Sequence, residues 1–304
     1  MGKEKVLILG SRGLLGTSFR EHIKRNEISE IEFLYGVRTE NDIETDNDIV
    51  FDILKADEYI SVFEDVDIII NCVAYTDVDK AETDEMNYTL NHDAVKRLSQ
   101  LCKDYNVYLI HFSTDFVFSG FKRVRNFNPE DLKYPANHYG KAKALGEVAI
   151  EDSGCDYLMF RISWLYSELK PNFITKIYDK LSNNEDVIAI NDIVSGLTYA
   201  DDLVKEILVM IINRNIYEED VKNRFYHYRN EGDVSVYEIA EYIKEYCNSK
   251  GEVKSVSRED FNFKAVRPPY SSLSTDTFKK TFNSNIPSWQ TSLKRCLDNY
   301  QKLV

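Results

Sequence analysis

Short apolar runs alternate with amphipathic stretches along the first half of the chain. The runs are of strand length, and their near-continuous apolar character is typical of strands buried in a parallel sheet. The predicted strands are Val6–Leu9, Ile31–Tyr35, Ile49–Ile53, Asp67–Cys72 and Tyr108–Phe112. Helical periodicity lies between them, most clearly over Asn87–Tyr105. This alternation predicts an α/β fold with a doubly wound parallel sheet of the Rossmann type.

The pattern changes after a further strand predicted at Tyr157–Ser163. Longer polar connections now separate helices, which we expect at Asn172–Ser182, Asp201–Ile212, Val236–Cys247 and Trp289–Leu303. We therefore expect residues 1–165 to form a dinucleotide-binding Rossmann domain, with a return of the chain to it near residues 192–215. Residues 166–304 are expected to form mainly a smaller C-terminal α/β lobe that binds the substrate.

Composition excludes several classes of protein. The chain has 304 residues, 43% of them hydrophobic, and a formal net charge of −13. Such a charge argues against nucleic acid as a partner, because phosphate binding needs dense Lys and Arg. The sequence has no apolar run of membrane-spanning length, and we expect no signal peptide. Its five cysteines have neither metal nor redox spacing, so we expect reduced thiols in a cytoplasmic protein.

A glycine-rich turn follows the first predicted strand. Gly10, Gly13 and Gly16 give the spacing G-x-x-G-x-x-G, and a helix is expected to run on to about Lys24. Strand, glycine turn and helix in this order bind the pyrophosphate of a dinucleotide, since the glycines permit close backbone approach and the helix N-terminus attracts anions.

The end of the second strand bears on the choice of cofactor. NAD-binding sites usually have Asp or Glu there to hold the ribose hydroxyls, but Gly36 stands at this position. Arg38 lies two residues further on, and Arg12 projects from the glycine turn. Two guanidiniums without a carboxylate suit the 2′-phosphate of NADPH, whereas the nearby Glu40 leaves NADH open. Asp52, after the third strand, is placed to meet the adenine amino group.

A second cluster of candidate residues begins at the end of the fifth strand. Thr114 follows that strand, and Tyr139 and Lys143 lie on one face of a predicted helix. A phenol is a poor acid at neutral pH, but an adjacent ammonium favours the phenolate and lowers its pKa. Thr114 and Tyr139 are then expected to hold a substrate oxygen between them.

Together these residues resemble the extended short-chain dehydrogenase/reductases, and within them the dTDP-4-dehydrorhamnose reductases. The likeness extends from Val6 to about Arg295. Its motifs are Asn71–Glu82, Ser113–Phe118, Tyr139–Glu147, Phe160–Tyr166, Arg267–Pro268, Ser272–Leu273 and Pro287–Trp289.

The resemblance implies NAD(P)H-dependent reduction of the C4 ketone of a nucleotide-linked 4-keto-6-deoxy sugar, as in dTDP-L-rhamnose synthesis. Tyr139 would donate the proton, Lys143 would lower the pKa of Tyr139 and hold the nicotinamide ribose, and Thr114 would bind the ketone oxygen. Substrate contacts would include Asp115 and Trp164. Cofactor contacts would include Gly13, Leu14, Leu15, Asp52, Ile53, Ala74, Tyr75 and Thr76.

Some features depart from the family pattern or leave alternatives open. Leu197 stands where relatives have proline, and no counterpart of their magnesium-binding acidic residues is seen, so no metal is expected. Arg267 could contact a diphosphate or form a surface ion pair. Phe116 cannot accept a proton, which disfavours a dehydratase.

An epimerase remains an alternative to the reductase. So does a non-catalytic, NADP-binding regulatory subunit like the β subunit of methionine adenosyltransferase. The sequence also leaves open dTDP or UDP as the nucleotide, the stereochemistry at C4, and whether the chain forms a homodimer.

Overall fold

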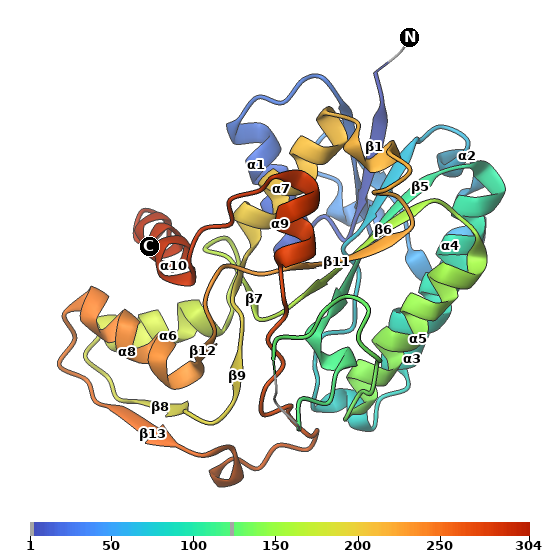
Figure 1. Ribbon diagram of the computed structural model, residues 1–304. Coiled ribbons are helices and arrows are strands. Elements are labelled where there is room, and N and C mark those ends of the chain that lie inside the picture. The colour runs from blue at the N-terminus through green and yellow to red at the C-terminus, as the bar shows by residue number, and fades with distance from the viewer. Residues whose placement is uncertain (1–2, 122–124) are drawn as a thin grey trace.

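The computed structural model describes residues 3–121 and 125–304. A seven-stranded parallel sheet runs through its centre (Figure 1). In spatial order the strands are β11 (Arg224–Tyr228), β6 (Tyr157–Ile162), β5 (Tyr108–Thr114), β4 (Ile68–Asn71), β1 (Lys5–Leu9), β2 (Glu32–Val37) and β3 (Asp48–Val50). The chain starts in the middle of the sheet and winds outward both ways, so the predicted Rossmann fold is confirmed.

Helices cover both faces of this sheet (Figure 1). One face packs against α1 (Leu14–Arg25), α7 (Ala200–Ile212) and α9 (Asp276–Phe282). The other packs against α2 (Ile60–Phe63), α4 (Ala94–Tyr105) and α5 (His138–Ser153). Apolar side chains on both faces of β1, β4, β5 and β6 are buried by these layers, which explains why these strands show no alternation of apolar and polar residues.

The helix predicted over residues 87–105 is divided in the structure. It consists of α3 (Met86–Tyr88), a π-helical turn η4 (Thr89–Asp93) and α4. In the π turn the Asn91 side chain bonds both the N–H and the carbonyl of Tyr75, at 3.1 and 2.9 Å. A π turn of this kind often marks a functional site, and here it fixes the loop after β4.

Two strands differ from the predictions. The third strand was expected to reach Ile53 but ends at Val50, and Asp52 instead caps the 3-10 helix η2 (Ile53–Tyr59) by accepting a hydrogen bond from the N–H of Leu54. β11 was not among the predicted strands, since its sequence mixes Arg, His and aromatic residues. Its His227 and Tyr228 are buried, and it pairs with β6 at the edge of the sheet.

A smaller group of elements lies beside the sheet. It contains α6 (Phe173–Ser182), α8 (Val236–Cys247) and α10 (Trp289–Tyr300), which share a separate apolar core. Short strands accompany them: β7 (Leu165–Tyr166), β8 (Val187–Ile190), β9 (Val194–Ser195), β10 (Thr198–Tyr199), β12 (Val234–Ser235) and β13 (Val253–Val256). The four helices predicted for this half are present as α6, α7, α8 and α10.

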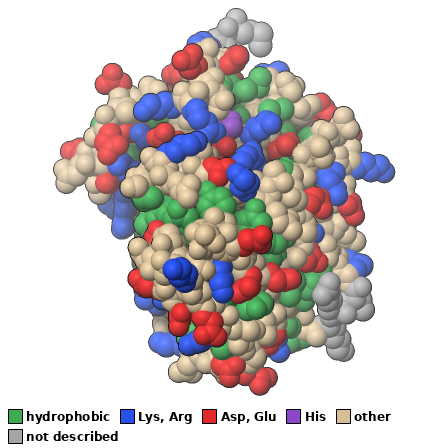
Figure 2. All heavy atoms as spheres, turned by 90° about the vertical axis from the view of Figure 1, so that its left-hand side faces the viewer, with side chains coloured by type: hydrophobic (Ala, Val, Ile, Leu, Met, Phe, Trp, Pro, Cys, Tyr) green, Lys and Arg blue, Asp and Glu red, His purple; other side chains and the backbone are tan. Residues whose placement is uncertain are grey.

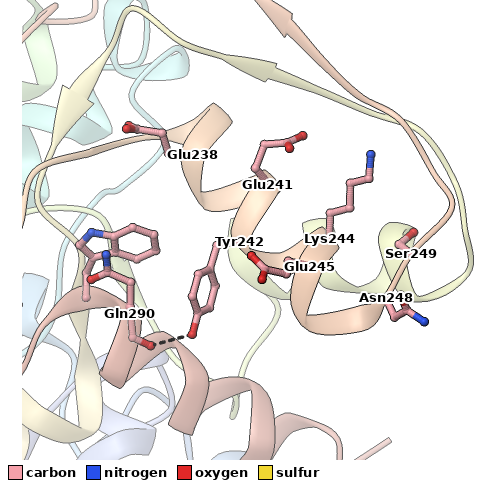
Figure 3. A pocket seen from close by; sticks show the side chains of 9 residues that line it. Glu238, Glu241, Tyr242, Lys244, Glu245, Asn248, Ser249 and Gln290 are labelled. Carbon is pink, nitrogen blue, oxygen red and sulfur yellow. Dashed lines mark hydrogen bonds between the residues drawn. The ribbon is translucent and has the colours of Figure 1, made fainter.

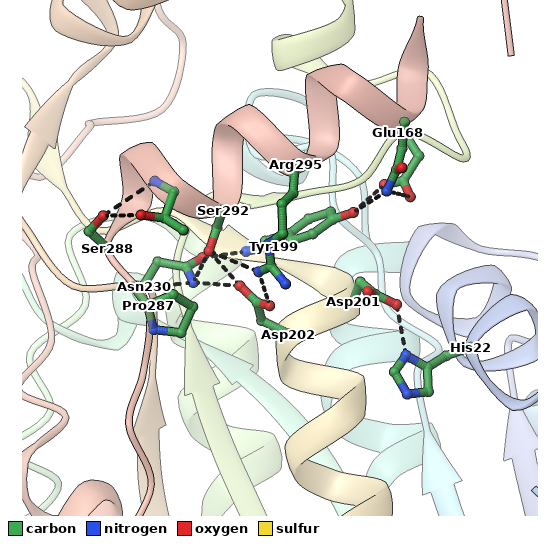
Figure 4. Close-up of polar contacts among 12 residues, drawn as sticks. His22, Glu168, Tyr199, Asp201, Asp202, Asn230, Pro287, Ser288, Ser292 and Arg295 are labelled. Atoms are coloured by element: carbon green, nitrogen blue, oxygen red, sulfur yellow. Dashed lines mark hydrogen bonds and ion pairs between the residues drawn. The ribbon is translucent and has the colours of Figure 1, made fainter. Parts of the chain in front are cut away.

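Polar contacts at the start of α7 join this smaller group to the sheet (Figure 4). Asp202 accepts hydrogen bonds from Asn230 at 2.8 Å and from Ser292, and it pairs with Arg295 on α10. Its neighbour Asp201 pairs with His22 on α1 at 2.7 Å. The first turn of α7 therefore links the helix layer of the sheet directly to α10.

No helix in residues 3–121 or 125–304 is long and apolar enough to span a membrane. Acidic and basic side chains are intermixed over the face of the molecule shown in Figure 2.

Candidate active site

A cavity of about 460 Å³ opens at the carboxyl ends of β1, β4, β5 and β6. Ligands bind at this edge in doubly wound sheets, because loops after parallel strands converge there. Predicted site residues that line the cavity are Gly13, Leu14, Leu15, Ala74, Thr76, Thr114, Asp115, Tyr139, Lys143 and Trp164. Residues far apart in the sequence are thus brought to one site.

The glycine turn has the close packing that a pyrophosphate site needs. Gly10 has a φ of +70°, which favours glycine. A Cβ on Gly16 would lie only 2.2 Å from the carbonyl oxygen of Gly10, so no larger residue fits where α1 passes the turn. The Ser11 hydroxyl donates to the carbonyl of Gly36 at 2.9 Å and ties the turn to β2. The N-terminus of α1 consequently faces the cavity, and the turn fits a dinucleotide.

The predicted cofactor-selecting residues lie at the outer end of this turn. Arg12 pairs with Glu44 at 2.7 Å and also donates to the carbonyl of Asp42. The expected pair of guanidiniums without a carboxylate is wrong here, because the loop after β2 brings Glu44 to Arg12. Arg38 is exposed, and within the described residues it forms no hydrogen bond or ion pair.

Two caps place the catalytic candidates. The side chain of Asn137 caps α5 by accepting from the N–H of Gly140 at 2.8 Å, which begins the helix just before Tyr139. Its amide nitrogen also donates to the carbonyl of Val266 at 2.8 Å. Thr114 caps the short turn after β5 and lines the same cavity as Tyr139. A hydroxyl and a phenol therefore meet at the cavity wall.

The surroundings of Tyr139 in the cavity affect its ionisation. Burial raises the pKa of Tyr139 to about 12, and although the Thr114 hydroxyl opposes this rise, the nearby Asp115 adds to it. Lys143 directs its Nζ atom to the carbonyl oxygen of Phe112, 2.6 Å away. At neutral pH Tyr139 is consequently a phenol, which is the form that can donate a proton.

Lys143 itself is almost completely buried, with 1% of its surface exposed. Burial lowers the pKa of Lys143 to about 8, while the charge of Glu147 opposes this shift. Its Nζ atom also lies 3.2 Å from Nε2 of His111. Both His111 and Asn71 behind it were missed as site residues. A single polar residue within an otherwise apolar strand is the signal that would have found them.

The substrate candidates Asp115 and Trp164 line the same cavity. Asp115 accepts hydrogen bonds from Ser195 at 3.0 Å, from Ser271, and from Thr114 at 3.1 Å. Burial raises the pKa of Asp115 to about 6, although these hydroxyls favour the carboxylate. Trp164 has a φ of +38°, an uncommon conformation for a bulky side chain, and such strain concentrates at functional sites.

Other predicted residues lie outside the cavity wall. Tyr75 directs its hydroxyl to Asp84, 2.9 Å away, while its neighbours Ala74 and Thr76 line the cavity. Asp52 and Ile53 lie after β3, where an adenine would be expected to reach. Arg267 pairs with Asp79 at 2.9 Å. None of the described residues form a group of three or more His, Cys, Asp or Glu that could hold a metal ion.

A second cavity, of about 470 Å³, lies between α8 and α10 (Figure 3). Glu238, Glu241 and Glu245 border it, and Tyr242 donates to the carbonyl of Gln290 at 3.2 Å. It contains neither the glycine turn nor the Tyr139–Lys143 pair. The cavity at the strand ends is therefore the candidate active site.

A Rossmann sheet, a glycine turn and a Tyr–Lys pair on one helix at the same cavity define an oxidoreductase of the extended short-chain dehydrogenase/reductase type. Residues 4–302 match the family model described as the RmlD substrate binding domain. The chain belongs to this family, as the sequence motifs predicted.

Named relatives agree with this assignment. A dTDP-4-dehydrorhamnose reductase from Aggregatibacter actinomycetemcomitans is 30% identical over 95% of this chain and 97% of the relative. One from Sinorhizobium fredii is 32% identical over 75% of this chain and 79% of the relative. The structure of the Bacillus anthracis dTDP-4-dehydrorhamnose reductase in complex with NADP matches with a TM-score of 0.85, at 28% identity, over 98% of this chain and 100% of that one.

Proposed function

We propose that this chain reduces the C4 ketone of dTDP-4-dehydrorhamnose with NADPH. The observation that carries the proposal is that Tyr139, Thr114 and the glycine turn line one cavity. The names of its relatives and the NADP complex of the Bacillus enzyme support this choice of substrate and cofactor.

The cofactor would lie along the carboxyl edge of the sheet. Gly10, Gly13 and Gly16 would allow its pyrophosphate to approach the N-terminus of α1, flanked by Leu14 and Leu15. Arg12 and Arg38 would bind the 2′-phosphate, and Asp52 and Ile53 the adenine. Ala74, Tyr75 and Thr76 would border the nicotinamide half, with Lys143 at its ribose. NADPH would supply the hydride to C4.

The arrangement of the hydroxyl groups indicates which residue would donate the proton. As charge develops on the ketone oxygen, the O–H bond of Tyr139 would break and a new O–H bond would form on the sugar. Thr114 would donate a second hydrogen bond to the same oxygen and stabilise that charge. Because burial keeps Tyr139 un-ionised, the proton is available at neutral pH without a preceding titration.

The substrate would bind between the sheet and the smaller group of elements. Asp115 lines the cavity and accepts hydrogen bonds from Ser195 and Ser271 in the second half of the chain, and Trp164 would pack on the sugar. We propose the division of the chain accordingly: residues 1–165 bind the cofactor and residues 166–304 mainly bind the substrate. Three elements of the second part, α7, β11 and α9, nevertheless pack with the main sheet.

The experiment is a reduction assay with dTDP-4-dehydrorhamnose generated in situ by its upstream enzymes, followed by loss of NADPH absorbance. The UDP analogue and NADH are tested in parallel, and the configuration at C4 of the product is determined by NMR. We expect rapid turnover with the dTDP sugar and NADPH. Tight NADP binding without turnover of either nucleotide sugar would contradict a reductase and favour a regulatory subunit.

A further inference from the structure

A carboxylate contacts the glycine turn, although none stands at the end of β2. Gly36 occupies that position, and its carbonyl oxygen accepts a hydrogen bond from the Ser11 hydroxyl at 2.9 Å. The loop between β2 and β3 supplies Glu44 instead, whose Oε1 atom lies 2.7 Å from Nη1 of Arg12. The proposed cofactor site includes Arg12 but gives Glu44 no role.

The backbone of Glu44 is held by a buried carboxylate. Asp48 begins β3, and its Oδ2 atom accepts hydrogen bonds from the backbone N–H groups of Glu44 and Thr45 at 2.8 and 2.9 Å. Its Oδ1 atom pairs with Arg20 on α1 at 2.6 Å. Although burial opposes ionisation, the hydrogen bonds from Arg20 and from the two N–H groups lower the pKa of Asp48 to about 2. Asp48 is therefore charged at neutral pH and keeps the loop in place.

Arg20 connects this carboxylate to the glycine turn. Its Nη1 atom donates to the Ser11 hydroxyl at 3.3 Å, and its Cζ atom lies 4.2 Å from the centre of the Tyr35 ring on β2. These contacts hold the backbone of the loop beside the turn. The side chain of Glu44 is itself 66% exposed, so its carboxylate can change partners without moving the loop.

The pairing of Arg12 with Glu44 can be exchanged for another. Both side chains are partly exposed to solvent, and such ion pairs contribute little to stability. Nη2 of Arg12 donates to the backbone carbonyl of Asp42, but its Nε atom is buried without a hydrogen-bond partner among the described residues. A buried donor without an acceptor is unfavourable. A ligand that offers Arg12 a better acceptor therefore competes with Glu44.

The two nicotinamide cofactors differ in the group that would reach this pair. NADH has a hydroxyl at the 2′ position of its adenosine ribose, and this hydroxyl can donate to a carboxylate. NADPH has a negatively charged phosphate there, which a carboxylate repels and a guanidinium binds. Glu44 and Arg12 meet beside the glycine turn, where the adenosine ribose of a dinucleotide binds. Each of the two side chains thus suits one of the cofactors.

We propose that Glu44 is a specificity-determining residue: its carboxylate binds the 2′-hydroxyl of NADH and must leave Arg12 before the 2′-phosphate of NADPH can bind there. The inference rests on the proposed function, because it concerns the cofactor of the same site. Glu44 takes the role of the acidic residue that NAD-binding sites usually have at the end of the second strand. The loop after β2, and not the strand end, then sets the preference between the cofactors.

The sequence suggested Glu40 for this role, but the structure places it differently. Glu40 is exposed, and in residues 3–121 and 125–304 its side chain forms no hydrogen bond or ion pair. The carboxylate of Asp42 accepts from the N–H and the hydroxyl of Thr39 at 3.0 and 2.7 Å, and only its backbone carbonyl contacts Arg12. Among the described residues of this loop, Glu44 is the carboxylate that contacts the guanidinium.

The first test measures binding without the reaction. Isothermal titration calorimetry gives the Kd of NADH and of NADPH for the unaltered full chain, for Glu44→Gln and for Glu40→Gln. The last variant is the matched control, since it removes the same charge from the same loop. In Glu44→Gln the Kd for NADH should rise about tenfold and the Kd for NADPH should fall about threefold or more, because one charged contact is lost and one competitor is removed. In Glu40→Gln both should change by less than about twofold.

The second test confines the measurement to the adenosine end of the cofactor. ADP-ribose and its 2′-phosphate lack the nicotinamide, so their Kd values report only on the glycine turn and the loop after β2. Glu44→Gln should weaken the binding of ADP-ribose and strengthen that of its 2′-phosphate. Opposite shifts that appear with NADH and NADPH but not with these two probes would overturn the inference, because Glu44 would then act on another part of the cofactor.

The outcomes separate this inference from the proposed function. Equal or absent changes for NADH and NADPH in Glu44→Gln would overturn the inference, as would weaker NADH binding in Glu40→Gln alone. If the unaltered chain binds both cofactors but reduces no nucleotide sugar, the proposed reduction fails, while the Kd values still decide the role of Glu44. Failure of the unaltered chain to bind either cofactor would overturn both proposals.

Discussion

The carboxylate of Glu147 on α5 accepts two hydrogen bonds from the guanidinium of Arg161 on β6, at 2.9 and 2.8 Å. Both side chains are buried, with exposed fractions of 0% and 2%. This pair holds the helix that carries Tyr139 and Lys143 against the sheet. Removing one charge leaves the other buried without its partner.

Glu147→Gln should therefore lower the free energy of unfolding by roughly 3–5 kcal/mol. Chemical denaturation monitored by circular dichroism measures this loss. Glu219→Gln is the matched control, because Glu219 forms an exposed pair with Lys222 and its loss should cost less than about 1 kcal/mol. Equal effects of the two variants would show that the buried pair does not hold α5.

Asp115 should give the stability a distinct dependence on pH. Its pKa is raised from 3.8 to about 6 in the folded chain, so the native state binds a proton more tightly than the unfolded state. The contribution of Asp115 to stability is therefore most favourable below pH 4, falls as the pH rises from about 4 to 6, and then stays constant.

Asp115→Asn removes this titration. The free energy of unfolding of the variant minus that of the unaltered chain should rise by about 3 kcal/mol from pH 4 to pH 7. This amount corresponds to a pKa shift of about two units. Urea denaturation at both pH values measures the difference. A constant difference between the two proteins would mean that Asp115 titrates normally.

The choice of cofactor should depend on Arg38 more than on Arg12. Arg38 is unpaired among the described residues and exposed, whereas Arg12 already has Glu44 as a counter-charge. Arg38→Ser should raise the KM for NADPH about tenfold or more, without changing that for NADH, since it removes a charged contact to phosphate.

Glu44→Gln should have the opposite effect and lower the KM for NADPH, because Arg12 loses a competing carboxylate. Steady-state kinetics with both cofactors distinguish these cases. Arg97→Ser is the control, because Arg97 on α4 forms an ion pair with Asp57 on η2. If Arg38→Ser raises the KM for NADPH and the KM for NADH equally, Arg38 does not bind the 2′-phosphate.

Much of this architecture follows from local sequence signals. The helix predicted at Val236–Cys247 has the same bounds in the structure, because Ser235 and Glu238 form a capping box at its start and Asn248 ends it. The glycine turn and the Tyr139–Lys143 spacing also depend on neighbouring residues only. Those features could be located before any contact was known.

Features that arise from long-range contacts could not be predicted in this way. β11 was missed because Arg224 and His227 interrupt its aromatic residues, and its buried Tyr226 and Tyr228 pack on Phe278 of α9. The raised pKa of Tyr139 and the lowered pKa of Lys143 result from burial, which the spacing of the two residues does not reveal. The pairing of Arg12 with Glu44 likewise depends on how the loop after β2 folds back.

The central claim is that Tyr139 donates the proton during reduction at the strand-end cavity. A single-turnover measurement tests it most directly: NADPH oxidation is followed after mixing with dTDP-4-dehydrorhamnose, for the unaltered chain and for Tyr139→Phe. Tyr134→Phe is the control, since Tyr134 is 75% exposed outside the cavity. We expect hydride transfer in Tyr139→Phe to slow by about 10²–10⁴-fold with an unchanged Kd for NADPH. Hydride transfer at the rate of the Tyr134→Phe control would contradict the claim.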